Sequence, residues 1–259
     1  MKFETILYEK QGHVATITLN RPEKLNSFNQ EMQDELMQVW RDVKFDDDIR
    51  VVVMTGAGDR AFCSGVDVGR ARDGGEPEHR IATRLSAKQN ECYKPVIVAV
   101  NGLAAGGGAY WLGSCEFAIA AEHATFFDPH VDRGLIPAEE PLLYMHMIPW
   151  QWVMRIALLG TKDRLDAQTA KAIGLVTEVV PKEELMPTAY RYAEIIAQHS
   201  PDAVQHAVEL LWKCKGLPLA QALDAGWMAI GAHSSSPDIE EGIQAFLEKR
   251  PPQWGRAAS

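Results

Sequence analysis

The chain has 259 residues, a formal net charge of −9, and 46% hydrophobic against 24% charged residues, which is typical of one large globular domain or of a domain with a helical appendage. The acidic balance argues against a nucleic-acid-binding protein, because such proteins usually carry a basic face. The four cysteines lack the spacing of a metal site, so we expect no metal. No stretch is apolar and long enough to cross a membrane, and residues 1–5 lack the apolar core of a signal peptide. We therefore expect no membrane association and a cytoplasmic location.

The first hundred residues alternate short strands with helical segments. Gln11-Gly12 lies between two β-rich runs and is a hairpin signal. From Phe28 to Trp40, large apolar residues recur every four positions, which predicts one buried face of a helix. The expected elements are strands over 5–9, 13–19, 51–54 and 95–100, helices over about 27–43 and 78–92, and a polar, mobile stretch over 67–80.

The second half begins with strands and ends in helices. Asp166 is a good N-cap for a helix that Gly174 terminates. The expected elements are strands over 117–121, 125–127 and 175–180, helices over about 141–159 and 167–173, further helices from residue 183 that break near 200–201, 216–218 and 234–237, and an extended tail over 251–254. This order predicts an α/β protein with a core of strand-strand-helix units over residues 1–198 and a helical oligomerisation region over 199–259.

The most informative stretch is the glycine-rich run from Asn101 to Tyr110. It follows the apolar strand over 95–100 and leads into a helical segment. Glycines at such a turn let a ligand approach the backbone, because a Cβ would block it. Backbone N–H groups at the start of a helix can then bind a negatively charged oxygen. The run therefore predicts an anion or oxyanion site.

Five stretches, spread over nearly the whole chain, carry a family pattern. They are Leu19–Asn26, Gly56–Asp67, Lys94–Gly108, Ala170–Val176 and Phe246–Arg250. In this order they resemble the crotonase (enoyl-CoA hydratase/isomerase) superfamily. The resemblance implies a spiral of ββα units with a C-terminal helical region that builds homotrimers, commonly paired into hexamers as dimers of trimers.

The resemblance also implies the substrate. A coenzyme A thioester would place its carbonyl oxygen between the backbone N–H groups of Val66 and Gly107, with coenzyme A entering as part of the substrate and no cofactor bound permanently. Loss of such a donor typically lowers kcat by about 10²–10³-fold. The residues that the resemblance assigns to coenzyme A are Lys24, Leu25, Asn26 and Ser64, with Phe246 and Lys249 reaching the nucleotide from another subunit. The alternative for Lys24 and Lys249 is a solvated surface lysine.

Two positions depart from the family's hydratases, which carry a glutamate at each. Tyr110 stands at the first position and His130 at the second. Syn addition of water needs one group to deprotonate the water and another to protonate the α-carbon. Tyrosine, with a pKa near 10, is a poor base at neutral pH. The chain is therefore expected to be a divergent member that does not use the usual hydration mechanism, with Tyr110 orienting substrate, donating a hydrogen bond or filling space.

His130 is the candidate acid/base residue, because imidazole titrates near neutrality. Nine residues later comes Glu139 with Glu140 beside it, and either carboxylate could hold the imidazole; Asp132 is a third candidate. The spacing of Asp128-Pro129-His130 and Glu139 resembles the 6-oxocamphor hydrolase branch, in which a histidine and an aspartate activate water to cleave a C–C bond. This chain has glutamate in place of that aspartate.

Three functions remain open at this point. The first is an acyl-CoA enzyme of the hydratase/isomerase type that uses His130 with Glu139 or Glu140. The second is a hydrolase that cleaves a C–C bond of a β-dicarbonyl or cyclic ketone, either linked to coenzyme A or free. The third is a non-catalytic acyl-CoA-binding protein, since both hydratase glutamates are absent.

Overall fold

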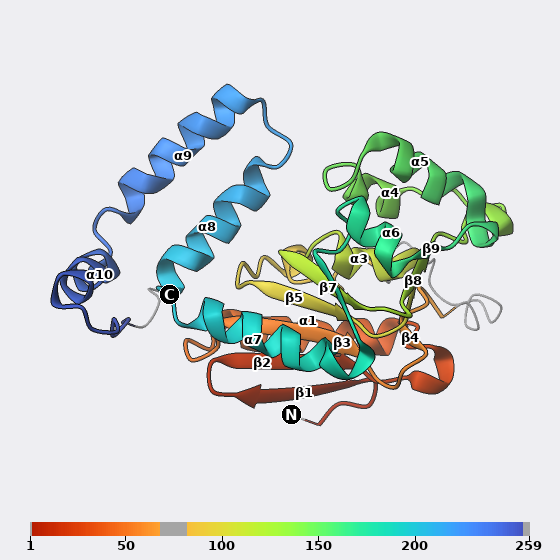
Figure 1. The fold of residues 1–259 in the computed structure, drawn as a ribbon, viewed down its shortest axis with the longest axis horizontal. Helices are drawn as coiled ribbons and strands as arrows, with labels where there is room; N and C mark the ends of the chain where they lie inside the picture. The colour runs from red at the N-terminus through yellow and green to blue at the C-terminus, as the bar shows by residue number, and fades with distance from the viewer. Residues whose placement is uncertain (1, 68–81, 256–259) are drawn as a thin grey trace.

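The computed structural model describes residues 2–67 and 82–255 (Figure 1). Most of the predicted mobile stretch over 67–80 lies outside the described residues. The described chain forms an α/β core with a group of helices extending from one side. The predicted fold class is therefore confirmed.

A six-stranded sheet forms the centre of the core. Its strand order is β1 (Ile6–Gln11), β2 (Val14–Leu19), β3 (Val51–Gly56), β5 (Val96–Val100), β7 (Phe117–Ala121) and β10 (Glu178–Val180). The first two strands form the predicted antiparallel hairpin, and every later neighbour is parallel. The inner strands are almost wholly apolar because both faces of the sheet are covered.

Alternate residues of the inner strands face two separate helices. Val52 and Met54 belong to the cluster of buried residues that includes the apolar face of α1 (Gln30–Phe45). Val51 and Val53 belong to a second cluster with α7 (Leu185–Ala197). This alternation follows from the two-residue period of a strand.

A smaller four-stranded sheet carries the loops of the candidate site. It orders β4 (Ala61–Cys63), β6 (Leu103–Ala105), β8 (Thr125–Phe127) and β9 (Leu165–Asp166). The helices near it are α3 (Ala109–Leu112), α4 (Glu139–Tyr144), α5 (Trp150–Leu159) and α6 (Ala167–Ala172). As predicted, the side chain of Asp166 caps α6 by accepting a hydrogen bond from the N–H of Thr169.

The predicted helix over 141–159 is instead two helices, α4 and α5, separated at Pro149. Proline has no N–H to donate, and its ring disfavours a helical conformation in the residue before it. Pro149 adopts an extended ψ of 140° and stands at the N-cap of α5, where its carbonyl accepts from Trp152 N–H. The proline therefore starts the second helix instead of lying inside one long helix.

Two other predicted elements are shorter than expected. Of the helix over 78–92, the described part contains only a 3-10 helix, Lys88–Asn90, because the side-chain oxygen of Gln89 accepts the N–H groups of Leu85 and Ser86. The strand over 175–180 begins only at Glu178, since the N–H groups of Leu175 and Val176 turn back to the carbonyl of Ala170.

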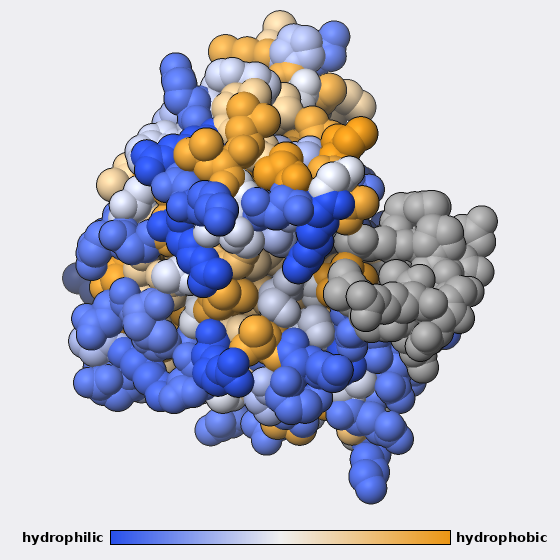
Figure 2. All heavy atoms as spheres, turned by 90° about the vertical axis from the view of Figure 1, so that its right-hand side faces the viewer, coloured by the Kyte–Doolittle hydropathy of each residue, from blue (hydrophilic) through white to orange (hydrophobic). Residues whose placement is uncertain are grey.

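The C-terminal helices expose much of their apolar surface. α8 (Pro201–Cys214), α9 (Leu219–His233) and α10 (Pro237–Glu248) extend away from the sheets on the left of Figure 1. Their exposed large apolar side chains are Leu211, Leu219, Leu223, Trp227, Met228, Ile230, Ile239, Ile243, Phe246 and Leu247. A second apolar area lies on the opposite side of the molecule, the side of α4 and α5, where Figure 2 shows hydrophobic side chains gathered in the upper part of the face.

Candidate functional site

The glycine run forms a tight turn between β6 and α3. Gly106–Gly108 is a short 3-10 helix, and Gly106 has a φ of 48°. Gly107 lies in the first turn of this helix, where N–H groups have no partner inside the helix. Within residues 2–67 and 82–255, no acceptor is found for the Gly107 N–H. The Gly107 N–H is therefore available to an oxygen of a ligand.

Val66 supplies a second donor beside this turn. Phe28 pairs with Val66 in an isolated parallel bridge that uses the carbonyl of Gly65 and the N–H of Asp67, and the Val66 N–H has no acceptor among the described residues. Gly65 has a φ of 95°, and a Cβ added there would lie 3.1 Å from the Gly107 nitrogen. The backbone leading into Val66 therefore packs directly against the turn, and the two predicted donors lie in adjoining loops.

His130 lies against the same turn, in the loop after β8. A Cβ added at Gly106 would be 3.6 Å from Cε1 of His130. Nδ1 of His130 is 2.5 Å from Oδ1 of Asp128, and the same oxygen accepts the His130 backbone N–H at 2.9 Å. On the other side of the ring, Nε2 is 3.8 Å from Oε1 of Glu140. The imidazole is thus flanked by two buried carboxyl groups, of Asp128 and Glu140.

Asp128 was not among the predicted site residues. An aspartate that accepts the backbone N–H two residues further on forms a common local turn, so the order Asp128-Pro129-His130 carried a signal for it. Donor atoms of Asp128, His130 and Glu140 lie within 4.8 Å of one another, a spacing that a metal ion could also use. With Nδ1–H donating to the Asp128 carboxylate, this contact is a hydrogen bond that needs no metal ion.

Glu139 and Asp132 have other partners. The hydroxyl of Tyr110 donates a hydrogen bond to Oε2 of Glu139 at 2.7 Å. Asp132 accepts from the Thr161 N–H at 2.6 Å, and this hydrogen bond holds the pKa of Asp132 below its usual range. Of the three carboxylates considered for His130, the structure therefore brings Glu140 nearest to the ring.

A cavity of about 380 Å³ opens beside the Tyr110–Glu139 pair. It is lined by Ser86, Lys88, Gln89, Tyr110, Ser114, Glu139, Leu142, Leu143 and Trp212. Trp212 comes from α8, so the helical region contributes one wall. The lining combines a polar end near Tyr110 with apolar side chains, which suits a ligand that has both kinds of surface.

The residues assigned to coenzyme A at the start of the chain lie in one loop. Lys24 is exposed, while Leu25 and Asn26 both adopt positive φ, at 52° and 54°. The buried Asn26 side chain donates to the carbonyls of Ala57 and Ala61 and therefore holds the loop together. Ser64 joins this loop by donating its N–H to the carbonyl of Leu25 at 3.1 Å. The loop of Lys24 and the segment of Ser64, both of which the resemblance links to coenzyme A, are thus neighbours.

Phe246 and Lys249 lie elsewhere. Both belong to the end of α10, on the far left of Figure 1, whereas the glycine turn and α3 lie in the core on the right. Phe246 is 83% exposed. A single chain does not bring these two residues to the loop of Lys24.

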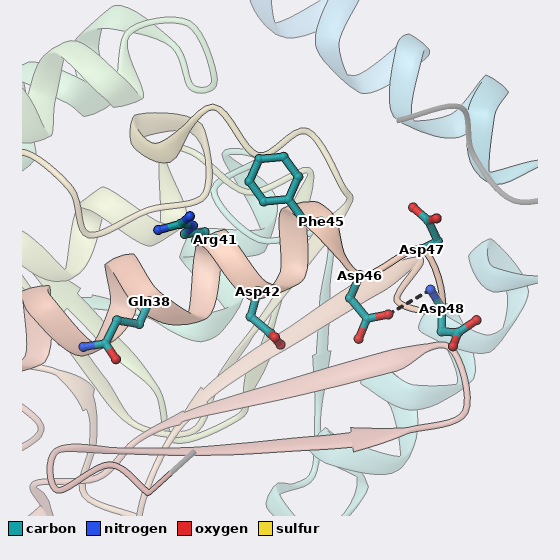
Figure 3. Close-up of a pocket in the computed structure, with 7 residues that line it drawn as sticks. All are labelled: Gln38, Arg41, Asp42, Phe45, Asp46, Asp47 and Asp48. Carbon is teal, nitrogen blue, oxygen red and sulfur yellow. Dashed lines mark hydrogen bonds between the residues drawn. The ribbon is translucent and has the colours of Figure 1, made fainter.

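A hollow of about 790 Å³ lies at the end of α1 (Figure 3). Its lining residues are Gln38, Arg41, Asp42, Phe45, Asp46, Asp47 and Asp48. The hydrogen bond from Lys10 is the main cause that lowers the pKa of Asp46, so this carboxylate is charged at neutral pH. The lining carries four carboxylates and one arginine, and Lys10 pairs with only Asp42 and Asp46, so the hollow remains acidic and is unfavourable for the phosphates of coenzyme A.

Burial raises the pKa of Glu140 above its ordinary value of 4.5, and the nearby His130 partly opposes the effect. A raised carboxyl pKa means that the folded state binds the proton more tightly, so stability falls as the pH rises through the interval between the unfolded and folded pKa values. Glu140→Gln removes this loss. We expect the variant to have a higher Tm than wild type at about pH 8 and no advantage at about pH 4 in calorimetric scans. Glu194→Gln, at an exposed position of α7, is the matched control, and a Tm difference for Glu140→Gln that is independent of pH would contradict the assignment.

Within the described residues, no helix has both the length and the apolar character needed to span a bilayer.

Comparison with known proteins agrees with the fold. The sequence profile of the family described as Enoyl-CoA hydratase/isomerase matches residues 9–257. The (E)-benzylidenesuccinyl-CoA hydratase of Thauera aromatica is 34% identical over 255 residues, covering 96% of this chain and 98% of the relative. The 1,2-epoxyphenylacetyl-CoA isomerase of Escherichia coli is 36% identical over 260 residues, covering 97% and 98%.

Solved structures agree as well. The crystal structure of an enoyl-CoA hydratase/isomerase from Mycobacterium paratuberculosis superposes with a TM-score of 0.89 at 36% identity, covering 98% of this chain and 99% of the other. The family acts on substrates linked to coenzyme A and uses no permanently bound cofactor. The chain therefore belongs to the enoyl-CoA hydratase/isomerase (crotonase) family and is an enzyme that acts on acyl-CoA.

Proposed function

We propose that the enzyme stabilises a thioester enolate or oxyanion with the Val66 and Gly107 N–H groups and transfers protons with His130. One juxtaposition carries this proposal: the backbone before Val66 packs against the Gly107 nitrogen, and His130 packs against Gly106. Two donors without another acceptor and a titratable ring meet at one turn. This is the arrangement needed to hold a negative oxygen while a proton moves nearby.

The neighbours of His130 define its role. With Nδ1–H donated to Asp128, the neutral ring carries its lone pair on Nε2, as in other histidine–aspartate pairs. Asp128 also stabilises the imidazolium that forms when Nε2 takes a proton. Glu140 lies 3.8 Å from Nε2 and has a raised pKa, so it can return a proton that His130 has removed. Tyr110 donates a hydrogen bond to Glu139, and both side chains line the cavity.

The acyl group that we propose is aromatic or of similar bulk. Two relatives of this chain are named for a benzylidenesuccinyl-CoA and a 1,2-epoxyphenylacetyl-CoA; the first carries an aromatic ring and the second a six-membered ring that is an epoxide of one. The cavity beside Tyr110 has a volume of about 380 Å³ and includes Leu142, Leu143 and Trp212 in its lining. Apolar and aromatic walls of this kind suit an aryl group more than a charged one.

A screen of acyl-CoA thioesters with detection by mass spectrometry tests this function. The panel contains saturated, 2-enoyl, aryl and β-keto thioesters of matched size. The proposal requires at least one of them to gain the mass of water or to isomerise without a change of mass. Tight binding of several thioesters with no product from any would contradict it and would favour a non-catalytic binding protein.

A C–C bond hydrolase is the second candidate, favoured by the short contact between His130 and Asp128. A histidine held in this way can deprotonate water for attack on a carbonyl. The β-keto thioesters of the same panel separate the two functions. Hydrolysis of a C–C bond gives a shortened or ring-opened acid, whereas hydration keeps the carbon skeleton intact.

Homotrimers, alone or paired into hexamers, are the expected assembly. The helices α8, α9 and α10 expose many large apolar side chains, and an extensive surface of this kind usually marks an interface. A second copy of the chain would cover this surface and bring its own Phe246 and Lys249 towards the loop of Lys24. Trp227 is 71% exposed on α9, and Trp227→Glu is therefore expected to reduce the assembly to monomers in light-scattering chromatography. Phe45→Glu, at an exposed position on α1, is the control and should leave the mass unchanged. A monomeric wild-type protein would overturn the assignment.

A further inference from the structure

Three metal-ligating side chains meet where α8, α9 and α10 come together, far from the glycine turn. Asp202 and His206 are four residues apart on α8 and so share one face of the helix. His233 is the last residue of α9. Nδ1 of His206 is 3.0 Å from Oδ1 of Asp202, and Nδ1 of His233 is 3.3 Å from Oδ2. One donor atom from each residue lies within 4.8 Å of the others.

One of these atoms is poorly satisfied. Nδ1 of His233 is buried and makes no hydrogen bond with any described residue, although it faces a carboxylate. Asp202 accepts from the hydroxyl of Ser236 at 2.6 Å, and Nδ1 of His206 also lies 2.9 Å from the Asp202 carbonyl oxygen. A buried nitrogen without a partner costs free energy, and a cation between the nitrogen and the carboxylate removes this cost.

We propose that Asp202, His206 and His233 bind a borderline transition-metal dication of the Zn²⁺ type. Two imidazoles and one carboxylate are a ligand set that zinc prefers, and water can take the fourth position. Tetrahedral ligands at about 2.0–2.1 Å from zinc are separated by about 3.3–3.4 Å. Nδ1 of His206 and Nδ1 of His233 lie 3.0 Å and 3.3 Å from different oxygens of Asp202, so a carboxylate that binds the ion through both oxygens has one imidazole nitrogen at about this separation from each.

The surroundings leave room for the ion and its water. A groove of about 400 Å³ borders the three side chains and also includes Glu209 and Ser235. The ligands come from α8 and α9, and Asp202 is hydrogen-bonded to Ser236 at the start of α10. A bound ion would therefore join α8 to α9, and each imidazole would bind it in the neutral form through a nitrogen lone pair. The site is independent of the proposed catalytic function.

Calorimetric titration of EDTA-treated, dialysed protein with ZnCl₂ tests the proposal. We expect saturable binding and a rise in Tm for the wild type. His206→Asn and His233→Asn should each weaken this binding at least about tenfold. Loss of a residue that only supports a metal ligand already weakens metal binding by about 10–100-fold. His199→Asn, at an exposed histidine of the same region, is the matched control and should bind like wild type.

The cluster at His130 could also take up zinc, so His130→Asn is titrated in parallel. The proposal requires the loss to appear in His206→Asn and His233→Asn and to be absent from His130→Asn, with circular dichroism showing that each variant is folded. Equal zinc affinity in wild type and both variants, a loss confined to His130→Asn, or no zinc binding by the wild type would each overturn it.

Discussion

Replacing His130 by alanine is expected to lower kcat by about 10²–10⁴-fold, the usual contribution of a positioned acid or base. The ring is held at Nδ1 by Asp128, and its Nε2 faces Glu140 beside the glycine turn. Its removal takes away the group that moves the proton and leaves Val66 and Gly107 in place. The expected result is a fall in kcat with KM changed only a few-fold, measured by steady-state kinetics on the best thioester of the screen.

A matched histidine variant controls for nonspecific effects. His146 lies between α4 and α5 and is exposed, so His146→Ala should leave both parameters unchanged. Circular dichroism and Tm measurements establish that both variants are folded. If His130→Ala retained the wild-type kcat, the proton transfer would have to be assigned to another group, with Tyr110 or Glu139 as the next candidates.

The second large effect is expected from Gly107→Ala. A Cβ at this position would lie 2.5 Å from Cε1 of Phe28, closer than real Cβ contacts. Phe28 is buried and packs edge-to-face against Tyr110 and Trp111, so the turn must shift instead. A shift of the Gly107 N–H away from the substrate oxygen removes one oxyanion donor, and such a loss typically lowers kcat by about 10²–10³-fold.

A second-site change distinguishes this effect from general damage. Phe28→Leu in the Gly107→Ala chain makes room for the added methyl and is expected to recover part of the lost kcat. Gly216→Ala is the control, because a Cβ there meets nothing within 4 Å. Wild-type kcat in a folded Gly107→Ala variant would contradict the role of this N–H group.

Much of the core could be predicted because it depends on local patterns. The hairpin follows from the turn residues Gln11-Gly12 between two β-rich runs, α1 from apolar residues spaced four apart, and β5 from a continuous apolar run. The glycine turn could also be predicted, since its glycines let a ligand approach the backbone closely. The adjacency of Gly65 and Gly107, sequence-distant loops, was predicted from the family resemblance and not from either loop alone.

The partners of the site residues were harder to predict because they depend on side-chain direction. Glu139 and Glu140 are neighbours in sequence, yet the first bonds to Tyr110 and the second lies near His130. Successive residues of a helix point about 100° apart, so the short α4 sends them to different places. The start of α4 could not be predicted, because the periodic pattern predicted one helix that continued through Pro149.

Exchange of the α-hydrogens of a saturated acyl-CoA with solvent deuterium tests the central claim most directly. The measurement needs no knowledge of the natural acyl group, because any bound thioester that reaches the enolate exchanges at the α-carbon. Mass spectrometry after incubation in D₂O should show deuterium uptake with the wild type, little with Gly107→Ala, and none above the uncatalysed rate with His130→Ala. Tight binding of the thioester without exchange by the wild type, or equal exchange by wild type and His130→Ala, would contradict the account.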